Sequence, residues 1–312
     1  ARLRSRRFRL VFAREPAKDE TDSMPTEPAQ IAIVIFEISL LLFGAGLALW
    51  LVFNPGARAR WLGTNALPGT PASLSNFVLI TVLIFLTGFA FQATAQLWLG
   101  PVIANATDQP GLALFVYSVA NYTGALVAWK VMFPSLRRSW AVDPETPPAT
   151  VPPPLPWAKA LRYSAGTLAV ALPVLSLVSL GWTFLVEQLG LPVAPQDVIA
   201  IFANTRSPLV IVAMLLVACV LAPIYEELLF RAGLYRFCRQ KLGRGTALLI
   251  SGVCFGALHG NWAGFLPLAV LGMGLAIAYE ATGSIRVPII AHGLFNLNTV
   301  LVLLSGLPEL AK

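Results

Sequence analysis

The chain has 312 residues, of which 57% are hydrophobic and 12% charged, and its mean hydropathy is +0.73. Soluble domains carry about twice that share of charged residues, so the composition excludes an ordinary soluble enzyme and indicates a polytopic membrane protein. The net charge is +7, and seven of the 22 basic residues lie in the first 18 positions. Such a tail is typical of a segment that rests on anionic lipid headgroups, and it has no aromatic pattern that favours a nucleic-acid partner.

Runs of about 20 predominantly apolar residues are long enough to cross a bilayer as helices. No sustained alternation of apolar and polar residues favours a barrel instead. The predicted fold class is therefore all-α, a polytopic membrane helix bundle with about eight transmembrane helices. The predicted spans, in chain order, are residues 31–53, 76–100, 111–133, 163–186, 208–228, 246–260, 263–281 and 286–305.

A proline-rich stretch divides the spans into two groups. DPETPPATVPPPLP has seven prolines in fourteen residues, which favours an extended connector over a helix. The predicted organisation is a basic N-terminal tail, a three-helix N-terminal membrane region, a proline-rich linker and a C-terminal core, at residues 1–30, 31–140, 141–160 and 161–312.

Charged residues are rare on the predicted spans and therefore informative. In YEELLFR, at the end of the fifth span, Glu227 and Arg231 are four residues apart and can pair on one helical face. Glu226 is turned by about 100° from its neighbour and can point toward another helix. We expect Glu280 to lie at an interface near Arg286, without a role in the site.

The chain has only two histidines, His259 and His292, and both fall on predicted spans. Phe255 precedes the first by four residues and Asn296 follows the second by four, so each pair shares a helical face. A carboxylate such as Glu226 and an imidazole that share a water can act as a general-base pair. A second imidazole and a carboxamide can donate hydrogen bonds to an oxyanion. These groups could add water to a peptide carbonyl.

Small residues suggest close packing of the spans that follow the fifth. Gly252, Gly256 and Gly260 recur every four residues, which is typical of small-xxx-small helix contacts in membranes. Gly272 and Gly274 are expected to serve the same purpose on the next span. We interpret these glycines as packing residues and not as catalytic ones.

Three motifs occur in a fixed order: EELLFR fits EExxxR, FGALH fits FxxxH, and HGLFN fits HxxxN. Together they resemble the CPBP family, the CAAX-prenyl protease and bacteriocin-processing enzymes that are also called Abi. The resemblance covers about residues 163–305. The three N-terminal spans and the basic tail carry no motif of this family.

The resemblance implies an intramembrane endopeptidase with its site recessed among helices. Glu226 would activate a water molecule, and His259 would assist as base and proton shuttle. His292 and Asn296 would stabilise the oxyanion. The supporting residues implied by the motifs are Glu227, Arg231 and Phe255.

The resemblance also implies a metal-independent glutamate mechanism, so no cofactor is expected. Zinc held by Glu226, His259 and His292 is the alternative, although HExxH is missing. A further alternative is a non-catalytic immunity, scaffold or transport protein that uses the same buried polar groups. The expected partners are membrane lipid and a protein or peptide substrate, prenylated or not, in a bacterial cytoplasmic membrane.

Overall fold

The computed structural model describes residues 27–63, 67, 73–139, 155–193 and 197–305. These ranges include all of the predicted spans. The predicted basic tail lies almost wholly outside them, as does most of the predicted proline-rich linker.

The described residues form helices and no strands, so the predicted all-α fold is confirmed. Seven helical stretches are long and apolar enough to cross a membrane, and α10 is a shorter apolar helix. The protein is therefore a multi-pass membrane protein. The helices are α1 (Glu27–Phe53), α2 (Pro55–Leu62), α3 (Leu74–Ile103), α4 (Gln109–Ser139), α5 (Trp157–Gln188), α6 (Asp197–Asn204), α7 (Pro208–Leu216), η1 (Val217–Leu221), α8 (Ala222–Glu227), η2 (Leu228–Tyr235), α9 (Arg236–Leu242), α10 (Arg244–Leu258), α11 (Trp262–Thr282) and α12 (Arg286–Leu304).

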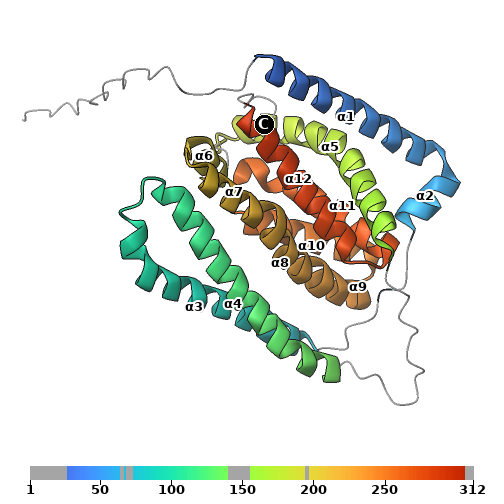
Figure 1. Ribbon diagram of the computed structural model, residues 1–312. Helices are drawn as coiled ribbons and strands as arrows, with labels where there is room; N and C mark the ends of the chain where they lie inside the picture. Colours follow the sequence, from blue (N-terminus) through green and yellow to red (C-terminus); the bar gives the residue numbers. More distant parts are fainter. Residues whose placement is uncertain (1–26, 64–66, 68–72, 140–154, 194–196, 306–312) are drawn as a thin grey trace, which may run out of the picture.

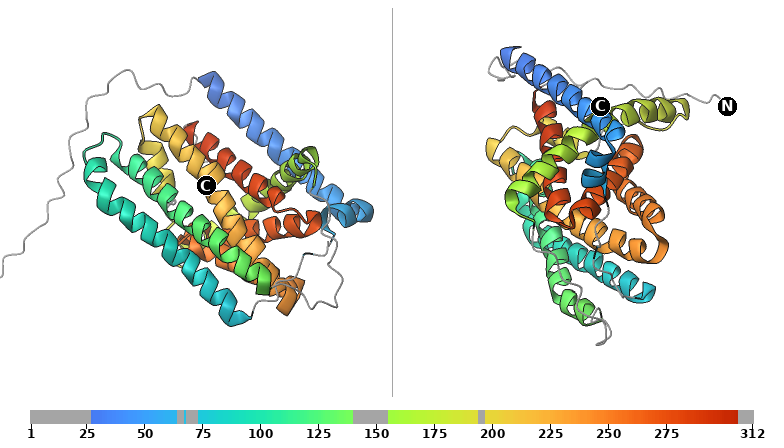
Figure 2. Two further views of the ribbon diagram at one scale, coloured as in Figure 1. Left: turned by 60° about the horizontal axis from the view of Figure 1, so that its bottom comes forward. Right: turned by 90° about the vertical axis from the view of Figure 1, so that its right-hand side faces the viewer.

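The helices form a central group with two flanking groups (Figure 1). The central group comprises α5, the segments from α7 to α9, α10, α11 and α12, which contact one another extensively. The α3–α4 hairpin lies along the α7 and α8 side of this group, and α1 lies along α5 on the opposite side (Figures 1 and 2). The N-terminal helices therefore pack against the core on two sides.

The fifth span is longer than predicted. The sequence predicts an end near residue 228, whereas one apolar helical stretch runs from Pro208 to Leu242 through the π-helical segments η1 and η2. It ends at Gly243, whose φ of 84° lies in the region that favours glycine. Two of the charges after residue 228 are neutralised by carboxylates: Arg231 pairs with Glu227 of the same stretch, and Arg239 pairs with Glu280 of α11.

Glu280 also has a part in this neutralisation, and its partners are not Arg286, near which it was predicted to lie, but residues earlier in the chain. Its carboxylate is buried and accepts hydrogen bonds from Tyr235 Oη, Arg239 Nε and Arg244 Nε, each at 2.8 Å. Arg286 instead packs over an aromatic ring at the start of α5, 4.4 Å from its centroid. Glu280 thus joins α11 to the end of η2, to α9 and to the start of α10.

Glycines let α10 and α11 approach closely, as predicted, but not at every position. A Cβ on Gly252 would lie 2.6 Å from the Ala269 carbonyl oxygen, and one on Gly272 would lie 3.1 Å from Gly252 Cα. Gly260 and Gly274 have open space instead. Gly260 follows the end of α10 and has a φ of 61°, so it turns the chain and does not pack.

Gly252→Ala is expected to destabilise the protein by about 1–3 kcal/mol, because the added methyl group meets backbone atoms that cannot move aside. Gly274→Ala is the matched control, and it should be neutral or stabilising by about 0.5–1 kcal/mol through helix propensity. Denaturant unfolding in detergent measures both. If Gly252→Ala and Gly274→Ala are equally stable, the close contact of Gly252 with α11 is contradicted.

Candidate active site

A fully buried ion pair lies at the centre of the bundle. Arg231 Nη1 donates to Glu227 Oε1 at 2.9 Å, as their spacing predicts, and neither side chain is exposed. Arg231 Nη2 donates to the Gly272 carbonyl oxygen at 2.9 Å, and its guanidinium carbon lies 4.5 Å from the Phe255 ring centroid. The arginine is thereby tied to three helical segments. Its positive charge compensates the negative charge of Glu227, because an unpaired carboxylate in this buried place would cost much free energy.

His292 extends the ion pair toward the second glutamate. Its Nδ1 lies 2.9 Å from Glu227 Oε1. A carboxylate only accepts hydrogen bonds, so Nδ1 is the protonated ring nitrogen and donates this hydrogen bond to Glu227. The orientation leaves His292 Nε2 facing Glu226.

The two adjacent glutamates have different environments, as the 100° turn between them predicts. Glu226 Oε2 lies 3.9 Å from His259 Nε2 and 3.9 Å from His292 Nε2. The Glu226 side chain is 19% exposed, whereas that of Glu227 is fully buried. Glu226 Oε2 makes no hydrogen bond to any described residue. The structure therefore brings Glu226, His259 and His292 together around one carboxylate oxygen.

The tautomer of His259 follows from its own helix. His259 is the C-cap residue of α10, and its Nδ1 lies 2.8 Å from the Phe255 carbonyl oxygen. A carbonyl only accepts, so Nδ1 carries the proton and Nε2 presents a lone pair to Glu226 in the neutral ring. The Trp182 indole of α5 donates to the Trp262 carbonyl oxygen at 2.7 Å, which holds the turn that follows His259. The bond to the Phe255 carbonyl thus orients the imidazole.

Phe255 packs among the polar groups more centrally than its motif position indicates. Its buried ring is 4.9 Å from the His259 ring and 5.6 Å from the His292 ring, both edge-on. It also faces Arg231. One aromatic side chain therefore packs against both imidazoles.

Asn296 donates through Nδ2 to the Ala218 carbonyl oxygen at 2.7 Å. In the π-helical segment η1, each carbonyl oxygen accepts from the N–H five residues later, as Val217 does from Ala222. The next carbonyl, that of Ala218, would therefore need an N–H at Pro223. Proline has none. Asn296 replaces the missing donor and so links α12 to the segment that carries Glu226. The structure does not place the Asn296 amide on the carboxylate cluster.

The three candidate zinc ligands do not have the geometry of a zinc site. Two donors of a tetrahedral zinc ion lie about 3.4 Å apart, whereas Glu226 Oε2 is 3.9 Å from each Nε2 of His259 and His292. Across the described part of the chain, no group of three His, Cys, Asp or Glu side chains is arranged to hold a metal ion. The donor positions therefore do not fit zinc.

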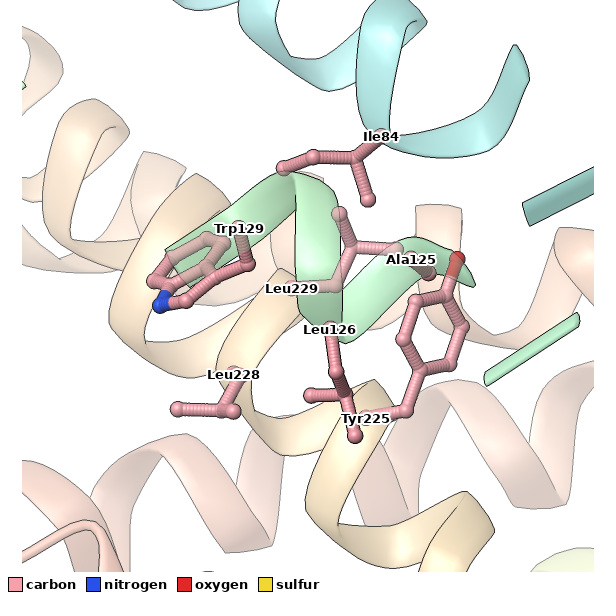
Figure 3. Close-up of a pocket in the computed structure, with 7 residues that line it drawn as sticks. All are labelled: Ile84, Ala125, Leu126, Trp129, Tyr225, Leu228 and Leu229. Atoms are coloured by element: carbon pink, nitrogen blue, oxygen red, sulfur yellow. The ribbon is translucent and has the colours of Figure 1, made fainter. Parts of the chain in front are cut away.

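The N-terminal hairpin also reaches the site, which no motif indicated. A small apolar pocket lies where α3 and α4 meet α8 and η2 (Figure 3). Tyr225, directly before Glu226, forms part of its wall, and its ring packs at a tilt against that of Tyr122 of α4. The residues that line the pocket are Ile84, Ala125, Leu126, Trp129, Tyr225, Leu228 and Leu229.

The fold and the site together define a multi-pass helical membrane protein with a buried Glu–Arg pair and a second, partly accessible glutamate between two histidines. Residues 208–298, which contain all of these groups, match the family model described as type II CAAX prenyl endopeptidase Rce1-like. The predicted resemblance to the CPBP family is therefore confirmed for this segment.

A curated relative matches part of the chain. The Bacillus subtilis (strain 168) protein named "Putative membrane peptidase YdiL" is 34% identical over 92 residues. These residues are 30% of this chain and 38% of that protein. No solved structure matches the chain.

Proposed function

We propose that the protein is an intramembrane endopeptidase in which Glu226 and His259 activate a water molecule. The observation that carries the proposal is the 3.9 Å separation of Glu226 Oε2 from the Nε2 atoms of both histidines. This separation is too long for a direct hydrogen bond, and Glu226 Oε2 has no other hydrogen-bond partner among the described residues. We infer that a water molecule is the missing partner in the active protein. The similarity of residues 208–298 to CAAX prenyl endopeptidases supports a protease.

In the proposed reaction, the water oxygen attacks the substrate carbonyl carbon while its proton passes to Glu226. His259 Nε2, unprotonated in the neutral ring, shares this base function and relays the proton to the leaving amine when the C–N bond breaks. The products are a carboxylic acid and an amine. No oxidant, reductant or cofactor is consumed.

His292 and Asn296 are proposed to stabilise the oxyanion. His292 Nδ1 is engaged with Glu227, so its Nε2 donates only when the ring is an imidazolium. Asn296 uses one amide N–H on Ala218 and retains a second. Glu227 and Arg231 are positioning residues in this scheme, because they hold His292 and the helix that carries Glu226.

The substrate is proposed to be a membrane-associated peptide or protein, prenylated or not. A site among helices that cross the membrane is accessible to substrates anchored there. The relative from Bacillus subtilis supports placing the protein in a bacterial cell membrane.

The proposal is tested with the purified protein in detergent and fluorogenic peptides that do or do not carry a farnesyl group. We expect cleavage of at least one class, and we expect that 1,10-phenanthroline and EDTA do not reduce the rate. Loss of cleavage with the chelators, restored by zinc, would favour the zinc-dependent alternative. If no peptide is cleaved, even after reconstitution in lipid vesicles, a non-catalytic role would replace the proposal.

A further inference from the structure

The α3–α4 hairpin lies outside the segment that resembles known proteases, yet it contacts the helix that carries Glu226. Helix α4 packs against α7, η1 and α8. The rings of Tyr122 and Tyr225 lie 5.1 Å apart between centroids, with an interplanar angle of 33°. Since Tyr225 immediately precedes Glu226, this ring contact places Tyr122 against the turn of α8 that carries the candidate catalytic carboxylate.

The hairpin holds Tyr122 in a defined position. A Cβ on Gly124 would lie 2.7 Å from the Thr87 carbonyl oxygen, so the two helices are in close contact directly beside Tyr122. On the other side, Asn121 Nδ2 donates to Gln92 Oε1 at 3.2 Å. These polar and backbone contacts fix the position of α4 relative to α3 on both sides of the tyrosine.

The Tyr122 hydroxyl is available in this arrangement. The side chain is half-buried, and its hydroxyl makes no hydrogen bond to any described residue. The phenol also lies close enough to Glu226 to experience its charge. A phenol in an apolar wall normally finds a hydrogen-bond partner, and a peptide bound at Glu226 would bring carbonyl oxygens to this place.

We propose that Tyr122 is a further substrate-binding residue whose hydroxyl donates a hydrogen bond to a backbone carbonyl of the peptide held at Glu226. The proposal rests on the proposed endopeptidase function. It assigns to the N-terminal hairpin a direct part in substrate recognition. The hydroxyl contributes the hydrogen bond, and the ring contributes the contact with Tyr225 that positions it.

Tyr122→Phe tests the proposal because it removes the hydroxyl and keeps the ring contact. We expect kcat/KM for the cleaved peptide to fall by about tenfold, which corresponds to one hydrogen bond to substrate. The thermal unfolding midpoint should not change. Tyr117→Phe is the matched control, since Tyr117 is also half-buried on α4 but places its hydroxyl beside Gly100 of α3. It should keep wild-type kcat/KM.

Glu226→Gln is measured in the same series to separate the two proposals. If Glu226→Gln is inactive while Tyr122→Phe matches wild type within twofold, the role of Tyr122 is overturned and the proposed function stands. If both tyrosine variants lose activity equally together with stability, Tyr122 has only a structural role and the proposal is likewise overturned. A wild-type protein that cleaves no peptide would overturn the proposed function and this inference together.

Discussion

Glu226→Gln will lower kcat/KM for peptide cleavage by about 10³-fold or more while the protein remains folded. The amide has nearly the same shape but cannot accept the proton of the attacking water, and general-base catalysis contributes about 10²–10⁴-fold. The loss of the carboxylate charge beside His259 and His292 adds to this effect. Initial rates with the wild type and the variant measure the loss, and the thermal unfolding midpoint verifies the fold.

Glu187→Gln is the matched control for this change, because Glu187 is an exposed glutamate near the end of α5 and far along the chain from the site. It should retain full activity. A Glu226→Gln variant that cleaves within tenfold of wild type would show that another group activates the water.

Arg231→Leu is expected to destabilise the protein more than Gly252→Ala does. It leaves Glu227 as a fully buried carboxylate whose remaining partner in the described residues is His292. Removing one partner of a buried ion pair typically costs about 3–5 kcal/mol. We expect a loss of this size in the free energy of unfolding, measured by denaturant titration in detergent.

A double substitution distinguishes the orphaned charge from lost packing. Arg231→Leu combined with Glu227→Leu removes both charges, so it should recover much of the stability that the single variant loses. Arg239→Leu is the control. Its side chain is 35% exposed, and its partner Glu280 keeps Arg244 and Tyr235, so its effect should be much smaller. Equal losses of unfolding free energy for Arg231→Leu and Arg239→Leu would contradict the claim that Arg231 compensates a buried charge.

The parts of the fold that depend on local pattern could be predicted from the sequence. Apolar runs predict the spans because helix length must match bilayer thickness. The pair between Glu227 and Arg231 follows from i, i+4 spacing, and the different direction of Glu226 follows from the helical turn. The motifs also identified His259 and His292, which the structure brings to the same carboxylate oxygen.

The parts that depend on contacts between distant residues could not be predicted. The carbonyl of Ala218 is available to Asn296 because Pro223 follows a π-helical segment, and helix register of this kind is set by packing. The partners of Glu280 lie 36 to 45 residues earlier in the chain, so proximity in sequence to Arg286 was misleading. The only local signal was the run of basic residues after the fifth predicted span.

The N-terminal helices show the same limit for the site itself. Tyr122 lies about 100 residues before Glu226, and it carries no motif that links it to the core. Only the packing of α4 on η1 and α8 brings it to Tyr225. Substrate-binding residues on such a hairpin can be identified only from the tertiary contacts.

The central claim is that Glu226 and His259 act together on one water molecule, and a double-mutant cycle tests it most directly. Residual kcat/KM is measured for Glu226→Gln, His259→Ala and the double variant under the same conditions. Residues that act as a unit are strongly non-additive. We therefore predict that the double variant cleaves peptide within about threefold of the slower single variant. A double variant whose loss equals the product of the two single losses would show that the residues act independently and would contradict the shared water.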